Sequence, residues 1–129
     1  MTITNVYTAE AFGAAPEINV SPQKVTPGVT TTALFVNYKL TLGNAQCSRS
    51  NSPRLYWACS PFSVAASAAR NTFRPQAVYV DMLPSEVSAG QTADSSEIIV
   101  NNGGFIYIWV DAPDMGADAS LDVKLVEID

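Results

Sequence analysis

The chain contains no histidine, and its seven lysine and arginine residues are outnumbered by twelve aspartate and glutamate residues. Without histidine it lacks the commonest general base, and it lacks the serine–histidine and cysteine–histidine pairs that activate nucleophiles. Because phosphate recognition relies on clustered lysine and arginine, a net charge of −5 argues against a nucleic-acid partner. We therefore predict a non-enzymatic protein that takes no cofactor and binds no nucleic acid.

Cysteine is also scarce, and the two cysteines lack the paired spacing and the neighbouring histidines of a zinc site. Cys59 falls in phase with Leu55 and Trp57 on the apolar face of a predicted strand, which favours a buried thiol. A disulfide between Cys47 and Cys59 is the alternative, and it would require an oxidising compartment.

Long apolar runs are missing too. No run reaches the ~20 residues that a membrane-spanning helix needs, and the first residues carry neither the positive region nor the apolar region of a signal peptide. We expect a protein that is made in the cytoplasm, stays soluble and has no membrane partner.

What the sequence does contain is a strongly apolar stretch at residues 103–111, Gly-Gly-Phe-Ile-Tyr-Ile-Trp-Val-Asp. In a strand, Phe105, Tyr107 and Trp109 face one side and the intervening aliphatic residues face the other, so both faces are apolar. Such a strand requires cover on both sides. We predict the central strand of a β-sandwich, entered through a turn at the preceding Asn-Asn-Gly-Gly.

Turn signals separate this stretch from the other predicted strands, which cover residues 2–8, 31–42, 54–60, 76–83, 97–101 and 119–128. A short helix is predicted over residues 61–70, with Ser60 as its N-cap. The expected inward residues include Val78, Val80 and Met82. Ile98 and Val100 are expected in a hairpin with residues 105–111, and Val126 is expected at a bulge.

The resulting fold prediction is an all-β protein: a single-domain, antiparallel, jelly-roll-like β-sandwich of about seven strands with one short helix. Residues 9–30 contain three prolines, two glycines and little periodicity, so they are predicted to form an extended arm that lies on a neighbouring subunit. The predicted division places an N-terminal edge strand and arm at residues 1–30 and the sandwich at residues 31–129.

Charge is distributed unevenly along the chain. Residues 1–75 hold six bases and two acids (6 − 2 = +4), and residues 76–129 hold one base and ten acids (1 − 10 = −9). One interpretation is that the two halves interleave within one sandwich. The other is an oligomer, predicted to be a trimer, with an apolar interface of Phe105, Tyr107 and Trp109 and a basic rim of Arg49, Arg54, Arg70 and Arg74.

Two further kinds of site have candidate residues. Acids at Asp111, Asp114 and Asp118 could supply oxygen ligands to calcium, although the EF-hand spacing is missing. Asp81 and Asp111 are the nearest candidates for a catalytic carboxylate pair, yet each lies at a strand end, where a solvated acid is the usual finding.

Aromatic side chains allow another interpretation, because aromatic platforms on sandwiches stack on sugar rings. Tyr56, Trp57 and Trp109 are the candidates for such a carbohydrate-binding or receptor-binding site. The simpler interpretation places these residues in the core or in a subunit interface.

The last third of the chain, with Phe-Ile-Tyr-Ile-Trp-Val-Asp-Ala-Pro followed by Ala-Asp-Ala-Ser-Leu-Asp-Val-Lys-Leu-Val-Glu, resembles the ends of small structural proteins of tailed bacteriophages. The resemblance implies a small β-sandwich that decorates or builds the capsid, binding itself and the major capsid protein. The expected location is therefore the virion, after synthesis in the host cytoplasm. A glycan-binding or receptor-binding module of a tail or head fibre is the alternative.

Overall fold

The computed structural model describes residues 3–11, 22–27, 33–41, 53–82, 92–100, 104–111 and 120–128. Within these residues it contains eight strands, one α-helix and one 3-10 helix. In chain order these are β1 (Ile3–Ala11), β2 (Gln23–Val25), β3 (Ala33–Thr41), β4 (Arg54–Ser60), α1 (Ala66–Phe73), η2 (Arg74–Gln76), β5 (Val78–Asp81), β6 (Thr92–Val100), β7 (Phe105–Asp111) and β8 (Ser120–Ile128).

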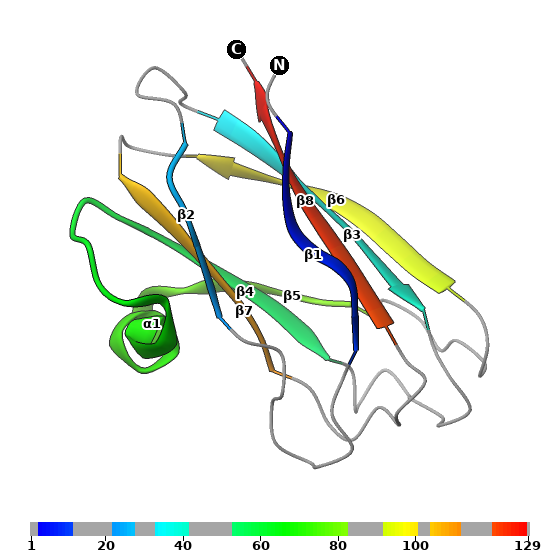
Figure 1. Ribbon diagram of the computed structural model, residues 1–129, viewed down its shortest axis with the longest axis horizontal. Coiled ribbons are helices and arrows are strands. Elements are labelled where there is room, and N and C mark those ends of the chain that lie inside the picture. Colours follow the sequence, from blue (N-terminus) through cyan, green and yellow to red (C-terminus); the bar gives the residue numbers. More distant parts are fainter. Residues whose placement is uncertain are drawn as a thin grey trace.

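The strands form two antiparallel sheets with the orders β1-β8-β3-β6 and β2-β7-β4-β5 (Figure 1). The first strand therefore pairs with the last, the second with the seventh, the third with the sixth and the fourth with the fifth. This nested pairing is that of one long hairpin rolled into two sheets, which is a jelly roll. The predicted fold class is confirmed, with eight strands in place of about seven.

The core lies between the sheets and follows the alternation that the sequence predicts for its clearest strand. Leu34, Val36, Tyr38 and Leu40 of β3 are buried, and the inward residues of β8 lie beside them. Across the layer they meet aliphatic residues of β7 together with Leu55 and Trp57 of β4. At roughly 1.5–3 kcal/mol for each fully buried large apolar side chain, this layer is the main source of stability.

Strand β8 keeps an unbroken register with β3, so the predicted bulge at Val126 is wrong. The acidic residue after it, Glu127, continues the inward row of β8 and is buried. The irregular strand is β1, whose pairing with β8 shifts register twice. Ala9 lies at one of these shifts with a positive φ of 46°, and its N–H donates to the Asp122 carboxylate at 3.0 Å.

The described parts of the predicted arm belong to the sandwich. Strand β1 continues to Ala11 at the edge of one sheet, and β2 pairs with β7 at the edge of the other. Both strands lie before residue 30, yet they pair with strands near the C-terminus. The arm prediction is therefore wrong for residues 9–11 and 23–25, whose sheet hydrogen bonds do not require an alternating apolar pattern. Residues 12–21 and 28–30 of the predicted arm lie outside the described residues.

Two predictions about the middle of the chain are also wrong. Val78 is exposed because β5 is a short edge strand, although Val80 packs against the core and Met82 is fully buried. Strand β6 does not form a hairpin with β7. It pairs with β3 in the opposite sheet, and Ile99, the residue of β6 whose burial the structure describes, is buried.

A glycine is required just before β7 because the backbone at this position lies very close to the backbone at the end of β4. A Cβ atom at Gly104 would lie 2.3 Å from the carbonyl oxygen of Ser60 and 2.8 Å from the nitrogen of Pro61. Both atoms belong to the backbone, which cannot move aside as a flexible side chain could. Gly104 therefore allows the start of β7 to pack against the end of β4.

Candidate interaction surfaces

The aromatic face of β7 is covered by the chain's own helix, which lies against this face of the sheet (Figure 1). Tyr107 and Trp109 are fully buried beneath α1 together with Ala69 and Phe73. The Phe73 ring lies 4.7 Å from that of Tyr107. The predicted subunit interface on this face is therefore wrong for these two residues, because intramolecular packing already excludes water from them.

The hydroxyl of Tyr107 explains why the helix begins at Ala66 and not at residue 61. It donates to the carbonyl of Phe62 and accepts the N–H of Val64, each at 2.9 Å. These two bonds hold the segment before the helix in a non-helical conformation. Ser60, the predicted N-cap, does accept the N–H of Phe62 at 3.1 Å, as an N-cap would, but the helix does not start there and Ala65 occupies its N-cap position. A buried tertiary contact thus overrides the local helix signal.

The predicted sugar-binding platform is buried as well. Tyr56 stacks on Trp109 with ring centroids 5.5 Å apart and planes at 5°, while Trp57 points into the core between the sheets. The three aromatic candidates, none more than 6% exposed, cannot stack on a sugar without unfolding part of the sheet. Phe105, the third residue of the predicted interface, is half-buried beneath the ammonium group of Lys24, which lies 4.3 Å from its ring.

The described arginines of the predicted rim meet acids of their own chain. Arg54 lies 3.0 Å from Asp81, and hydrogen bonds to Tyr56 and Asp81 raise its pKa. Arg70 and Arg74 both contact Asp111, at 2.8 and 3.1 Å. These contacts favour the interleaved interpretation of the charge distribution. Arg49 lies outside the described residues.

The same contacts weaken two other candidate sites. Both carboxylate oxygens of Asp111 face arginines, which would compete with a calcium ion for these oxygens. The other calcium candidates, Asp114 and Asp118, lie outside the described residues. Among the described residues, no three His, Cys, Asp or Glu side chains are close enough to hold a metal. The catalytic candidates Asp81 and Asp111 both lie in register with Arg54, which separates them.

Cys59 continues the inward row of β4, but it lies at the end of the strand and is exposed, so the prediction of burial is wrong. Neighbouring groups still shield its sulfur from water, which raises the pKa of the thiol and makes it less reactive than an ordinary surface cysteine. Cys47 lies outside the described residues, and the predicted alternative of a disulfide stays open.

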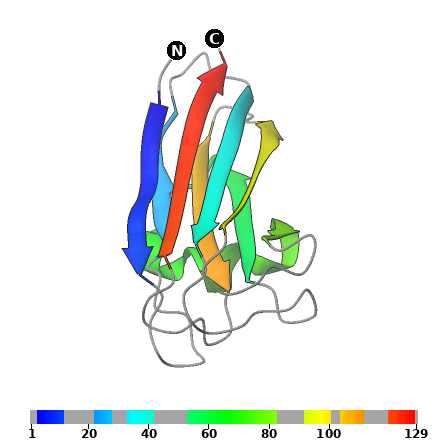
Figure 2. The same ribbon diagram turned by 90° about the vertical axis from the view of Figure 1, so that its right-hand side faces the viewer.

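The outer face of the β1-β8-β3-β6 sheet is different, because α1 packs on the opposite sheet and none of the described helices and strands lies over this face (Figure 2). Three apolar residues form a row across it, with Val126 paired to Ile3 on one side and to Phe35 on the other. Ile3 and Phe35 are 57% and 37% exposed. An apolar row at outward positions of a sheet is a typical mark of an interaction surface.

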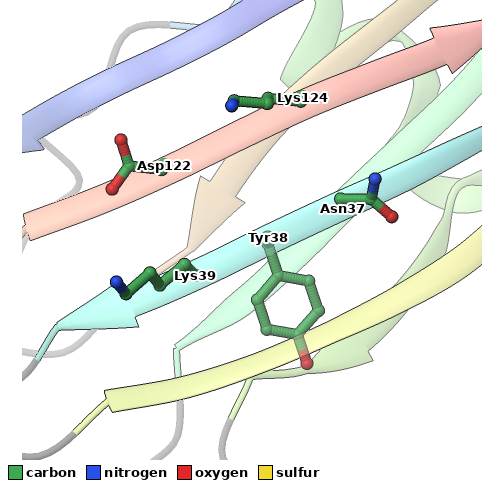
Figure 3. A pocket seen from close by; sticks show the side chains of 5 residues that line it. All are labelled: Asn37, Tyr38, Lys39, Asp122 and Lys124. Atoms are coloured by element: carbon green, nitrogen blue, oxygen red, sulfur yellow. The ribbon is translucent and has the colours of Figure 1, made fainter.

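The other half of this face is polar and slightly hollowed (Figure 3). Asn37 and Lys39 of β3 lie beside Lys124 and Asp122 of β8, in the register Asn37–Lys124 and Lys39–Asp122. We define the outer face of the sheet, from the apolar row to these four residues, as the open face. Sequence reasoning missed it, although apolar Phe35 and Val126 at outward positions of otherwise alternating strands were the available signal.

Comparison with known proteins assigns no family to the chain, because no family model and no curated protein matches it. Within the described residues, no helix is both long and apolar enough to cross a membrane.

Proposed function

We propose that the chain is a non-enzymatic structural protein of a tailed-bacteriophage virion, a capsid decoration or minor capsid protein that binds itself and capsid subunits. The observation that carries the proposal is the jelly-roll pairing of the eight strands, because viral capsid proteins are a principal class with this fold. The resemblance of the last third to phage structural proteins supports the same class. The open face supplies a surface on which such a protein could assemble.

The proposal predicts that the protein is a component of purified virus particles. Particles from cells that produce the encoding virus would be banded by density, and the copy number of the chain would be measured by quantitative mass spectrometry. We expect many copies per particle and a lower temperature of head disruption when the gene is deleted. A protein that is abundant in the lysate but missing from intact particles contradicts the proposal.

The alternative, a glycan-binding or receptor-binding module, keeps support from the fold because lectins also use jelly rolls. The aromatic residues predicted to bind the sugar do not support it, since they are buried. Saturable binding to a defined glycan, together with location on a fibre and not on the head, would favour this alternative over capsid decoration.

A further inference from the structure

We infer that the open face is a homodimer interface, in which β3 of one chain packs on β8 of a second copy across a twofold axis. The inference does not depend on a role in a virion. It differs from the oligomer predicted through β7, whose aromatic residues are already covered. The observation that selects a second copy as the occupant is the pairing of chemically matched residues across β3 and β8.

The geometry follows from the register. Consider a twofold axis that runs parallel to these strands, just outside the open face and midway between β3 and β8. This axis places each β3 residue of one copy opposite a β8 residue of the other copy. That β8 residue is the one with which the β3 residue is in register within a single chain. In such an isologous interface, each contact occurs twice. Register partners within one chain therefore become opposing residues between two chains.

The resulting contacts are complementary over three consecutive outward pairs. Phe35 lies over the partner's Val126, so apolar surface meets apolar surface. The next outward pair places Asn37 over the partner's Lys124, where an amide oxygen can accept from the ammonium group. The next places Lys39 over the partner's Asp122, which brings opposite charges together twice. The face is thus self-complementary, although the chain as a whole has a net charge of −5.

Sheet twist is compatible with this arrangement. Two twisted sheets that pack face to face cross at about −30°, so opposing rows drift apart with distance along the strands from the point where they cross. Consecutive outward residues are roughly 6.6 Å apart along a strand, and the drift over that distance is about 3 Å. Lysine and aspartate side chains can span such a shift, and the apolar row supplies most of the affinity while the charged pairs set the orientation.

The first test measures self-association of the full chain by sedimentation equilibrium over a concentration series. We expect a monomer–dimer equilibrium, with a dissociation constant weakened at least about tenfold by Phe35→Ser. Phe62→Ser is the matched control, because Phe62 is 73% exposed on the segment before α1 and should leave the equilibrium unchanged. A wild-type chain that stays monomeric at every attainable concentration, or a dimer that Phe35→Ser does not weaken, overturns the inference.

The second test uses charge reversal between two different variants. Lys39→Asp places two acids opposite each other in its homodimer, and Asp122→Lys places two lysines opposite each other, so each variant alone should associate more weakly. In a mixture of the two, both contacts of the heterodimer join opposite charges, and association should recover. An effect confined to one chain cannot produce this recovery. Two folded variants that stay apart when mixed overturn the geometry.

Folding of each variant would be checked by circular dichroism and thermal melting, because Asp122 also accepts the N–H of Ala9. If Asp122→Lys does not fold, Asn37→Lys, whose homodimer places two lysines opposite each other, is mixed with Lys124→Asp to test the neighbouring position. There one of the two contacts becomes an opposite-charge pair in the heterodimer, and the other keeps the wild-type pair of Asn37 and Lys124. Recovery in that mixture supports the inference, and its failure overturns it.

Discussion

Replacing Tyr107 with phenylalanine isolates the contact that joins α1 and its preceding segment to the sandwich. The Tyr107 ring is fully buried and would stay in place, so the change creates no cavity. What disappears is a hydroxyl that donates to the carbonyl of Phe62 and accepts from the N–H of Val64, each at 2.9 Å. Both partners come from the non-helical segment before α1, so this one atom positions that segment.

The magnitude follows from counting these bonds. A typical intramolecular hydrogen bond contributes about 0.5–1.5 kcal/mol, so loss of both should reduce the free energy of unfolding by about 1–3 kcal/mol. For a domain of this size, a loss of 2 kcal/mol lowers the melting temperature by roughly 6–10 °C. The dependence on denaturant concentration should keep its slope, because the fold and its buried area are unchanged.

Urea unfolding followed by tryptophan fluorescence measures this loss, and hydrogen exchange locates it. The Val64 amide should exchange faster than the global loss of stability explains, whereas amides in the middle of β3 should follow the global change. Tyr79→Phe is the control, because the Tyr79 side chain is half exposed on the edge strand β5 and its change should stay within about 0.5 kcal/mol. A Tyr107→Phe protein as stable as wild type, with an unaltered Val64 exchange rate, would refute the reasoning.

Three further predictions follow from the described contacts. Asp111→Asn should lower the free energy of unfolding by about 1–3 kcal/mol, because it leaves Arg70 and Arg74 without their carboxylate. Asp81→Asn affects an exposed pair and should lower it by only about 0–1 kcal/mol. Urea titration measures both changes. Burial, and to a lesser extent the charge of Glu10, raises the pKa of Tyr7 above its value in the unfolded chain. The unfolded state therefore loses the proton first, and stability falls as pH rises above about 10, by up to ~1.4 kcal/mol per pH unit. Urea titrations at several alkaline pH values should show a shallower fall in Tyr7→Phe, and an identical fall in both proteins contradicts the assignment. Deletion of residues 9–30 should unfold the domain, as judged by loss of its cooperative thermal transition, because it removes all of β2 and the end of β1. A deleted protein that still melts cooperatively would restore the arm hypothesis.

Local periodicity predicted the strands that lie in the middle of the sheets. In β3, side chains alternate between the core and the outer face, as the alternation of apolar and polar residues in this stretch predicts. Strand β7 is apolar on both faces, and it does lie between two layers, as the sequence required. These elements could be predicted because their burial follows from position within the strand.

The features that the sequence did not predict depend on partners far away in the chain. The segment 61–65 has a helical signal, yet the Tyr107 hydroxyl, more than 40 residues later, holds it in another conformation. Strand β2 has three residues and no apolar alternation, and its place is set by pairing with β7. The cover of the aromatic face likewise comes from residues distant in the sequence. The predicted helix ends at residue 70, but the helix continues to Phe73, whose side chain packs with Tyr107 and Trp109.

The nested order of the strands also explains the uneven charge along the sequence. A jelly roll pairs each strand of the first half with one of the second half, so bases concentrated before residue 75 meet acids concentrated after it. Arg54 lies in register with both Asp81 and Asp111, and Lys39 lies in register with Asp122. Exposed pairs of this kind add little stability, roughly 0–1 kcal/mol each, while like charges placed opposite each other are unfavourable. Their effect is therefore on specificity: a register slip, or a pairing of two strands from the same half, would lose these matches and place like charges together. The same alternation of sign across β3 and β8 makes the open face complementary to a copy of itself, so one distribution of charge directs both the folding register and the proposed dimer.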